Sequence, residues 1–208
     1  MDEYLVPTAR ADAGFTEKRS RFLGHIFPVD SEEEALAALK ETREKYWDAN
    51  HNVFAYIIKD GPTRYSDDSE PQGTAGMPVL DVLRRQEVYN VLCVVTRYFG
   101  GVLLGAGGLV RAYTKGAASV LGAAGLSVKR VWRHVEIPCP YAQLERVRQA
   151  VEQHGGLLCG TDYAENVLLH TMFPAAGTDG FLAALTDLTS GTVSGEPGEQ
   201  EYRAFPVK

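Results

Sequence analysis

Cysteine is scarce in this sequence, and the few cysteines present form no recognisable framework. The 208 residues include only Cys93, Cys139 and Cys159, which are widely spaced and contain no C-x-x-C pair. Small disulfide-stabilised secreted domains and structural zinc sites use closely spaced pairs. The sequence therefore predicts neither, and we expect the reducing environment of the cytoplasm.

Long apolar runs and a leader-like beginning are also absent. The first residues, MDEY, lack the basic and apolar regions of a secretory signal. The most apolar stretch, residues 116–128, is too short to span a bilayer and lies between Lys115 and Lys129. We expect no membrane association.

The chain has no excess of positive charge. It carries 21 Lys+Arg against 27 Asp+Glu, a formal net charge of −6. Residues 1–130 carry 16 against 17 (net −1) and residues 131–208 carry 5 against 10 (net −5), which sum to −6. An acidic chain is not attracted to RNA as a whole. Any RNA binding should use a local basic surface in the first part.

The pattern of apolar residues predicts an α+β protein with two domains, over residues 1–132 and 133–208. In the first, we expect strands at 21–29, 52–59, 63–66 and 91–98. Helices should follow Ser31 and Pro78 and cover 109–124. Ser31 and Glu34 match a capping box, in which Glu34 would accept the Ser31 backbone N–H. Residues 67–76 lack periodicity and should form a loop.

The second domain shows the order βαββαβ, which is typical of a ferredoxin-like fold. The expected strands are 135–139, 157–163, 166–173 and 201–205, and the expected helices are 141–154 and 178–188. The double glycine at 155–156 suits the end of the first helix.

Polar residues of the kind used in binding sites gather in three segments of the first domain, one opening a strand, one in the acidic loop and one in a Gly-rich turn. Because loops at strand ends collect polar groups, we expect these segments to converge. The candidate binding residues are His51, Asn52, Asp67, Asp68, Glu70, Thr74, Arg97, Tyr98, Gly100, Gly101, Gly107, Gly108 and Arg111.

The acidic loop allows two interpretations. Asp67, Asp68 and Glu70 with His51 would form a hard-ligand set for magnesium or manganese. Alternatively, they pair with Arg97, Arg111 or backbone N–H groups. Two nearby arginines offset three carboxylates without a metal, so we expect the second arrangement, with no metal and no cofactor.

The Gly-rich turn also has two interpretations. It precedes a helix, so its N–H groups and the two arginines could hold an anion. It is neither a P-loop nor a dinucleotide fingerprint, since no Gly-Lys-Ser/Thr follows and position 110 is Val110. The glycines could equally permit tight turns while the arginines hold the acidic loop. No nucleophile motif is present, and we expect no catalytic residues.

Several short motifs lie between residues 15 and 125: KRSRF at 18–22, DANHN at 48–52, AY at 55–56, SDDSEP at 66–71, GTAGMP at 73–78, TRYFGG at 96–101, LG at 104–105, GGL at 107–109 and RAY at 111–113. Taken together, these motifs resemble the IMPACT family in its bacterial YigZ-like form. Ser69 departs from the family pattern, which usually has glycine there and would tolerate a positive φ.

The resemblance implies that the first domain shares a fold with a ribosomal protein, the fourth domain of elongation factor G and the GHMP kinases. For the eukaryotic members it implies regulation of translation through protein partners, and for the bacterial members no settled activity. Our leading hypothesis is a translation-linked regulatory protein that binds RNA, a ribonucleoprotein surface or a protein through the first domain. The competing hypothesis is an enzyme or sensor that binds a phosphorylated small molecule at the Gly-rich turn. A pocket joining His51, Asp68, Arg97 and Arg111 would favour the second hypothesis.

Overall fold

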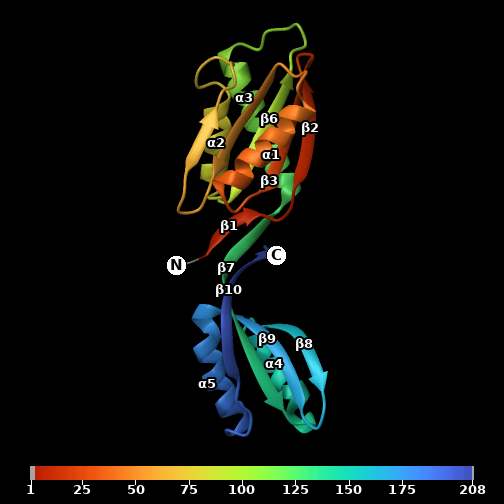
Figure 1. Cartoon of the computed structure of the whole chain (residues 1–208), viewed down its shortest axis with the longest axis vertical. Coiled ribbons are helices and arrows are strands. Elements are labelled where there is room, and N and C mark those ends of the chain that lie inside the picture. Colours follow the sequence, from red (N-terminus) through yellow and green to blue (C-terminus); the bar gives the residue numbers. More distant parts are fainter. Residues whose placement is uncertain (1–2, 208) are drawn as a thin grey trace. The chain divides into compact units, whose positions relative to one another are not determined.

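The computed structural model describes residues 3–207, which divide into two compact units. The N-terminal unit holds residues 4–129 and 204–207, and the C-terminal unit holds residues 130–203 and Glu3. Each unit is a sheet of antiparallel pairs with helices packed on it, which confirms the α+β class (Figure 1). The units divide at 129/130, inside strand β7 (Leu126–Cys139). The domain boundary at 132/133 stays a prediction.

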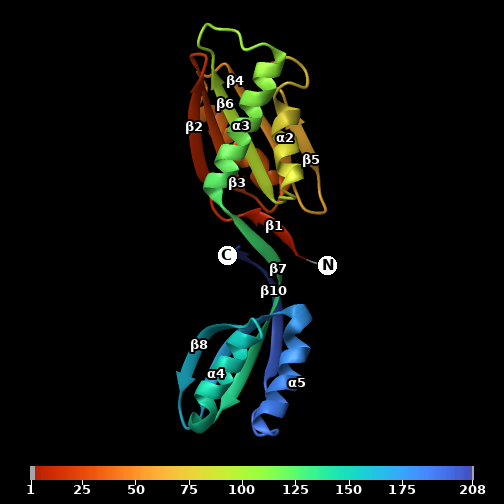
Figure 2. The same ribbon diagram turned by 180° about the vertical axis from the view of Figure 1, so that it is seen from behind.

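The N-terminal unit has a five-stranded sheet in the order β2-β3-β6-β4-β5. Helix α1 (Glu32–Lys45) covers one face, and α2 (Gly76–Arg85) and α3 (Ala106–Ala124) cover the other, as Figures 1 and 2 show from opposite sides. The strands are β2 (Ala11–Glu17), β3 (Ser20–Pro28), β4 (His51–Ile57), β5 (Thr63–Ser66) and β6 (Val91–Tyr98).

The central strand β6 explains why its sequence is a continuous apolar run. Seven of its eight residues are buried, because helices cover both faces of the sheet at this position. Val95 packs in the core under α2 and α3, and Val94 packs in the core under α1. The predicted bounds of this strand are confirmed.

Helix α1 begins largely as its sequence predicts. The Ser31 hydroxyl accepts a hydrogen bond from the Glu34 N–H at 3.2 Å. The Glu34 carboxylate, however, accepts from the Asp30 N–H at 2.8 Å and not from Ser31, so the expected return bond is wrong by one residue. Both bonds still satisfy free N–H groups at the beginning of the helix.

Two strands were not predicted, β1 (Tyr4–Pro7) and β2. Strand β2 has the sequence ADAGFTE, which is poor in residues that favour strands. It lies at the edge of the sheet, where its seven residues pair with β3. β1 pairs with residues 126–129, the first part of β7, which begins nine residues before its predicted start at 135.

The C-terminal unit has the predicted element order βαββαβ, with the strands arranged β10-β7-β9-β8. Its core contains Ile137, Val147, Leu169 and Phe181. The elements after β7 are α4 (Leu144–Gln153), β8 (Leu157–Tyr163), β9 (Val167–Pro174), α5 (Thr178–Thr189) and β10 (Glu196–Pro206). Among residues 3–207, no helix is both long and apolar enough to cross a membrane.

Candidate functional site

The segments singled out in the sequence meet where β4 begins and β6 ends. His51 and Arg97 are directly opposite each other on these neighbouring strands. The Asn50 N–H donates to the Arg97 carbonyl at 3.0 Å, and the Phe99 N–H donates to Asn50 Oδ1 at 2.7 Å. In Figures 1 and 2 the loops after β5 and β6 lie at this same end of the sheet. The register of two strands thus brings together residues 46 positions apart.

At the centre of this region is a buried ion pair between Arg97 and Glu70. Arg97 Nη1 lies 2.6 Å from Glu70 Oε1, and the two side chains are 6% and 4% exposed. The Tyr113 hydroxyl donates to the same oxygen at 2.7 Å. Burial, reinforced by the Glu70 charge, raises the pKa of Tyr113 well above its usual range, so this hydroxyl stays protonated. The guanidinium lies against the rings of Phe22 and Phe99.

His51 connects this ion pair to the acidic loop. Its Nδ1 lies 2.8 Å from the backbone carbonyl of Asp68, and a carbonyl can only accept, so Nδ1 carries the hydrogen. Its Nε2 lies 3.7 Å from Glu70 Oε1. The histidine therefore presents its second nitrogen to the carboxylate that already holds Arg97.

Asp67 holds the acidic loop through backbone groups alone. Its carboxylate accepts from the N–H groups of Gly73, Ala75 and Gly76 at 2.8–3.0 Å. Ala75, at the N-cap of α2, offers no capping side chain, so Asp67 satisfies these donors from eight residues upstream. This agrees with the expectation that the loop carboxylates bind backbone N–H groups.

Asp68 has a different arginine partner from those expected. Its Oδ2 accepts the Asn52 N–H at 2.6 Å, and its Oδ1 lies 3.6 Å from Arg43 of α1. Neither Arg97 nor Arg111 reaches it. No local sequence signal pointed to Arg43, because the contact depends on α1 packing beside the beginning of β4.

Ser69 has a positive φ of 70°, and Asp68 a φ of 45°. Left-handed backbone is unfavourable for residues other than glycine, by about 1–2 kcal/mol. The loop therefore keeps the conformation that glycine would favour at position 69, in spite of the serine.

Three further candidates have structural contacts. Asn52 is buried, accepts from the Thr96 hydroxyl at 2.7 Å and donates to the Tyr46 carbonyl at 3.2 Å. The Thr74 hydroxyl donates to the Pro71 carbonyl at 2.6 Å. Tyr98 follows Arg97 on the strand and donates to Asp48 at 2.7 Å.

The Gly-rich turn permits close packing. A Cβ at Gly100 would lie 2.1 Å from the backbone carbon of Arg19, so the chain can pass the β2–β3 turn only with glycine there. Gly101 has a φ of 80°. Helix α3 begins at Ala106, earlier than the predicted residue 109, so Gly107 and Gly108 lie in its first turn.

Arg111 does not join the network. It is exposed one turn along α3 from Gly107, and within residues 3–207 it forms no ion pair. The expected convergence therefore holds for His51, Asp67, Asp68, Glu70 and Arg97 but fails for Arg111.

A cavity of about 400 Å³ opens beside the ion pair. Its polar lining comes from Asn50, His51, Glu70 and Arg97, and its apolar lining includes Leu104. Asp68 and Arg111 do not line it. Phe99 and Leu103 also line it and are 44% and 82% exposed. Neither residue was among the predicted binding residues, although Phe99 lies in the TRYFGG motif and two apolar side chains in a Gly-rich turn were a usable signal.

The loop carboxylates have no arrangement suited to a metal ion. Across residues 3–207, no group of three His, Cys, Asp or Glu side chains is placed to hold one. Asp67 faces backbone N–H groups, and Glu70 faces Arg97 and Tyr113. Asp67 therefore stabilises the loop, and Glu70 lines the cavity.

Comparison with known proteins shows the family. The model described as "Impact N-terminal domain" matches residues 18–121, and a domain of unknown function, DUF1949, matches residues 137–192. The chain is 36% identical to IMPACT family member YvyE of Bacillus subtilis, covering 89% of this chain and 86% of that one. It is 34% identical to IMPACT family member YigZ of Escherichia coli, covering 93% and 97%.

A solved structure is also similar along most of its length. It is titled "Crystal structure of an hypothetical protein" and aligns with a TM-score of 0.61 and 34% identity, covering 96% of this chain and 98% of that one. The matched family segment contains every residue of the Arg97–Glu70 network described above. This chain therefore belongs to the IMPACT family, as a YigZ-like member.

Proposed function

We propose that this protein is a translation-linked regulatory protein that binds RNA through its N-terminal unit. The main support is a group of exposed aromatic or apolar side chains beside cations that form no ion pair among the described residues, at one end of the sheet. We call this group the loop-end surface: Lys18, Arg19, Arg21, Trp47, Phe99, Leu103 and Arg111. The link to translation rests on the family resemblance.

The cations of the loop-end surface are free to meet phosphates. Lys18 and Arg19 form the β2–β3 turn, whose backbone packs against Gly100. Within the described residues, none of Lys18, Arg19, Arg21 and Arg111 forms an ion pair with a carboxylate. The sequence between Glu87 and Glu136 also contains no Asp or Glu. Local positive charge can thus support phosphate binding despite the acidic total.

The aromatic residues offer stacking surfaces for bases. Trp47 is 82% exposed in the turn after α1, three residues before Asn50. Phe99 is 44% exposed, and the Arg97 guanidinium lies 5.5 Å from its ring. Unpaired bases stack on such rings, each contributing about 1–3 kcal/mol. Aromatic side chains interleaved with cations favour single-stranded RNA over a duplex.

The competing hypothesis of a phosphorylated small molecule has less support. The charge of Arg97 is already balanced by Glu70, and Arg111 lies away from the cavity wall. The Gly100 N–H is directed to the Ser20 hydroxyl at 3.3 Å and not to open space. The Gly100 N–H is therefore not available to a phosphate.

The test is fluorescence anisotropy of a labelled, unstructured single-stranded RNA with the full chain at a series of salt concentrations. We expect the logarithm of the binding constant to fall with the logarithm of salt, by about 0.7 per neutralised phosphate. Trp47→Ala and Phe99→Ala should each weaken binding roughly fivefold or more, since each removes a stacking surface.

The matched control is Tyr163→Ala, which removes an aromatic side chain of the C-terminal unit that is 65% exposed. It should leave the RNA affinity unchanged, because that part of the chain carries the acidic excess. No measurable RNA binding at low salt, or equal losses for Phe99→Ala and Tyr163→Ala, would contradict the proposal. Binding of a protein partner through the loop-end surface would then become the leading alternative.

A further inference from the structure

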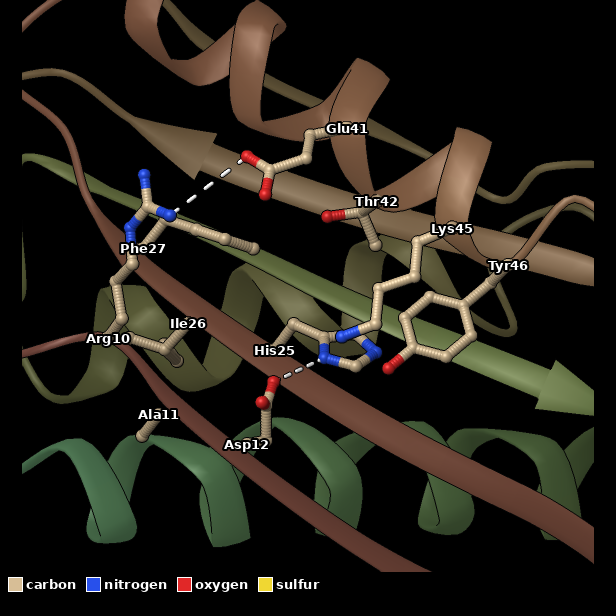
Figure 3. Close-up of a pocket in the computed structure, with 10 residues that line it drawn as sticks. All are labelled: Arg10, Ala11, Asp12, His25, Ile26, Phe27, Glu41, Thr42, Lys45 and Tyr46. Carbon is tan, nitrogen blue, oxygen red and sulfur yellow. Dashed lines mark hydrogen bonds and ion pairs between the residues drawn. The ribbon is translucent and has the colours of Figure 1, made fainter.

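A second cavity lies on the other face of the N-terminal sheet, under α1. It has a volume of about 290 Å³, just below the usual range for small-molecule sites. Figure 3 shows its polar side chains converging from the segment before β2, from β2 and β3, and from the end of α1. They are Arg10, Asp12, His25, Glu41, Thr42, Lys45 and Tyr46. None of them belongs to the Arg97–Glu70 network or to the loop-end surface.

His25 is the unusual member of this lining. Its side chain is only 4% exposed, and its Nδ1 lies 2.5 Å from Asp12 Oδ1. Its Nε2 is buried without a hydrogen-bond partner among the described residues. A buried polar atom left unpaired destabilises the folded state. An apolar side chain would fill the same space without that loss. The presence of histidine here therefore points to a hydrogen-bonding ligand for Nε2.

The Asp12 contact fixes which nitrogen can bind a ligand. A carboxylate only accepts, so Nδ1 carries the hydrogen and Nε2 is the unprotonated nitrogen of the neutral ring. Burial lowers the pKa of His25, although its bond to Asp12 acts in the opposite direction. The imidazole is therefore neutral at physiological pH when the cavity is empty of ligand.

Among the described charged groups around the cavity, one cation has no carboxylate within ion-pair distance. Arg10 lies 4.0 Å from Glu41, so these two offset each other. Lys45 forms no ion pair within residues 3–207, and its ammonium lies 5.1 Å from the centre of the Tyr46 ring. Figure 3 shows its side chain extending toward His25. If His25 gains a proton, Asp12 offsets that charge, and Lys45 remains to bind one negative charge.

We propose that this cavity binds a small ligand through an oxyanion, a carboxylate or a phosphate group, held between Lys45 and a protonated His25. The proton comes from solvent and binds Nε2, which then donates to a ligand oxygen while Nδ1 keeps its bond to Asp12. The Lys45 side chain is exposed and flexible, so it can shift to admit that oxygen. Binding thereby gives the buried nitrogen its missing partner.

Binding should therefore strengthen as the pH falls. The titratable and charged groups that face His25 come from the elements around the cavity: Arg10, Asp12, Glu41, Lys45 and Tyr46. On the neighbouring strand β6, the residue opposite His25 is Val94, which carries no charge. Only His25 among these changes its charge near neutral pH. One proton taken up with the ligand gives about a tenfold gain in affinity per unit of pH, above the pKa of the free protein.

The test is carbon–proton NMR of the histidine ring signals in the full chain, titrated separately with inorganic phosphate and with acetate. We expect one of the two anions to shift the His25 signal in a saturable way, more strongly at about pH 6 than at about pH 7.5. The responding anion identifies the group as phosphate or carboxylate. The signals of His134, His154 and His170, which belong to the C-terminal unit, should not move.

Two matched lysine variants decide the outcome. Lys45→Met should abolish the shift, and Lys40→Met, in the same helix but 79% exposed and 3.8 Å from Glu44, should leave it unchanged. Each variant's remaining histidine signals show whether it is folded. The proposal is overturned if neither anion moves the His25 signal at roughly tens of millimolar, or if both lysine variants respond as the original chain does.

Discussion

Replacing Glu70 by glutamine tests whether the central ion pair of the N-terminal unit stabilises the fold. The change keeps the size of the side chain and an oxygen for Arg97 and Tyr113, but removes the charge. Arg97 would then be a cation that is 6% exposed with no carboxylate to balance it. Breaking one partner of a buried pair costs about 3–5 kcal/mol. We expect the lower end, about 3 kcal/mol, because glutamine still accepts hydrogen bonds.

This loss should be easy to measure by differential scanning calorimetry of the full chain. A unit of this size loses roughly 3–5 °C of melting temperature per kcal/mol. Glu70→Gln should therefore lower the transition of the N-terminal unit by about 10–15 °C. Glu165→Gln, an exposed glutamate of the C-terminal unit, is the matched control and should change stability by less than about 0.5 kcal/mol.

A triple substitution separates the charge from the packing. Glu70→Leu with Arg97→Met removes both charges, and Tyr113→Phe removes the hydroxyl that would otherwise lose its acceptor. This variant should recover most of the lost stability, because a buried pair can be replaced by apolar groups at little cost. The reasoning is refuted if Glu70→Gln shifts the transition by less than about 2 °C. It is equally refuted if the triple substitution is no more stable than Glu70→Gln.

Three further perturbations follow from the same geometry. Asp68→Asn should destabilise the fold by about 1–2 kcal/mol, equally with and without EDTA, because the partners of Asp68 are an N–H group and an arginine. A metal site would be indicated instead if magnesium raised the melting temperature of the original chain and Asp68→Asn removed that rise. Ser69→Gly should raise the melting temperature, because glycine adopts a φ of 70° without strain. The control Ser119→Gly, inside α3, should lower the melting temperature. A change of the same sign in both variants would contradict the strain argument. Stability in urea should fall as the pH drops below about 6.5, because the pKa of His25 is lowered in the folded state and the unfolded chain takes up that proton first. His25→Gln should weaken this pH dependence, and an unchanged slope would argue against a buried neutral histidine.

The sequence alone determined the elements whose signals are local. The apolar run over residues 91–98 predicted β6 with its observed bounds, because a strand covered on both faces needs apolar residues throughout. Ser31 marked the beginning of α1 because a cap acts within one turn. The motifs between residues 15 and 125 carried the family, which the comparisons then confirmed.

The tertiary structure decided which of several chemically suitable partners each side chain contacts. Arg97 and Arg111 were equal candidates in the sequence, but only Arg97 lies on the strand opposite His51 and meets Glu70. β2 escaped prediction because its pairing with β3, and not its composition, makes it a strand. His25 was not predicted as a binding residue from the sequence, because its side chain becomes buried only when α1 packs over β3. Hydrophobic periodicity and caps act between neighbours along the chain, whereas ion pairs and buried polar atoms depend on strand register and helix packing, which join residues tens of positions apart.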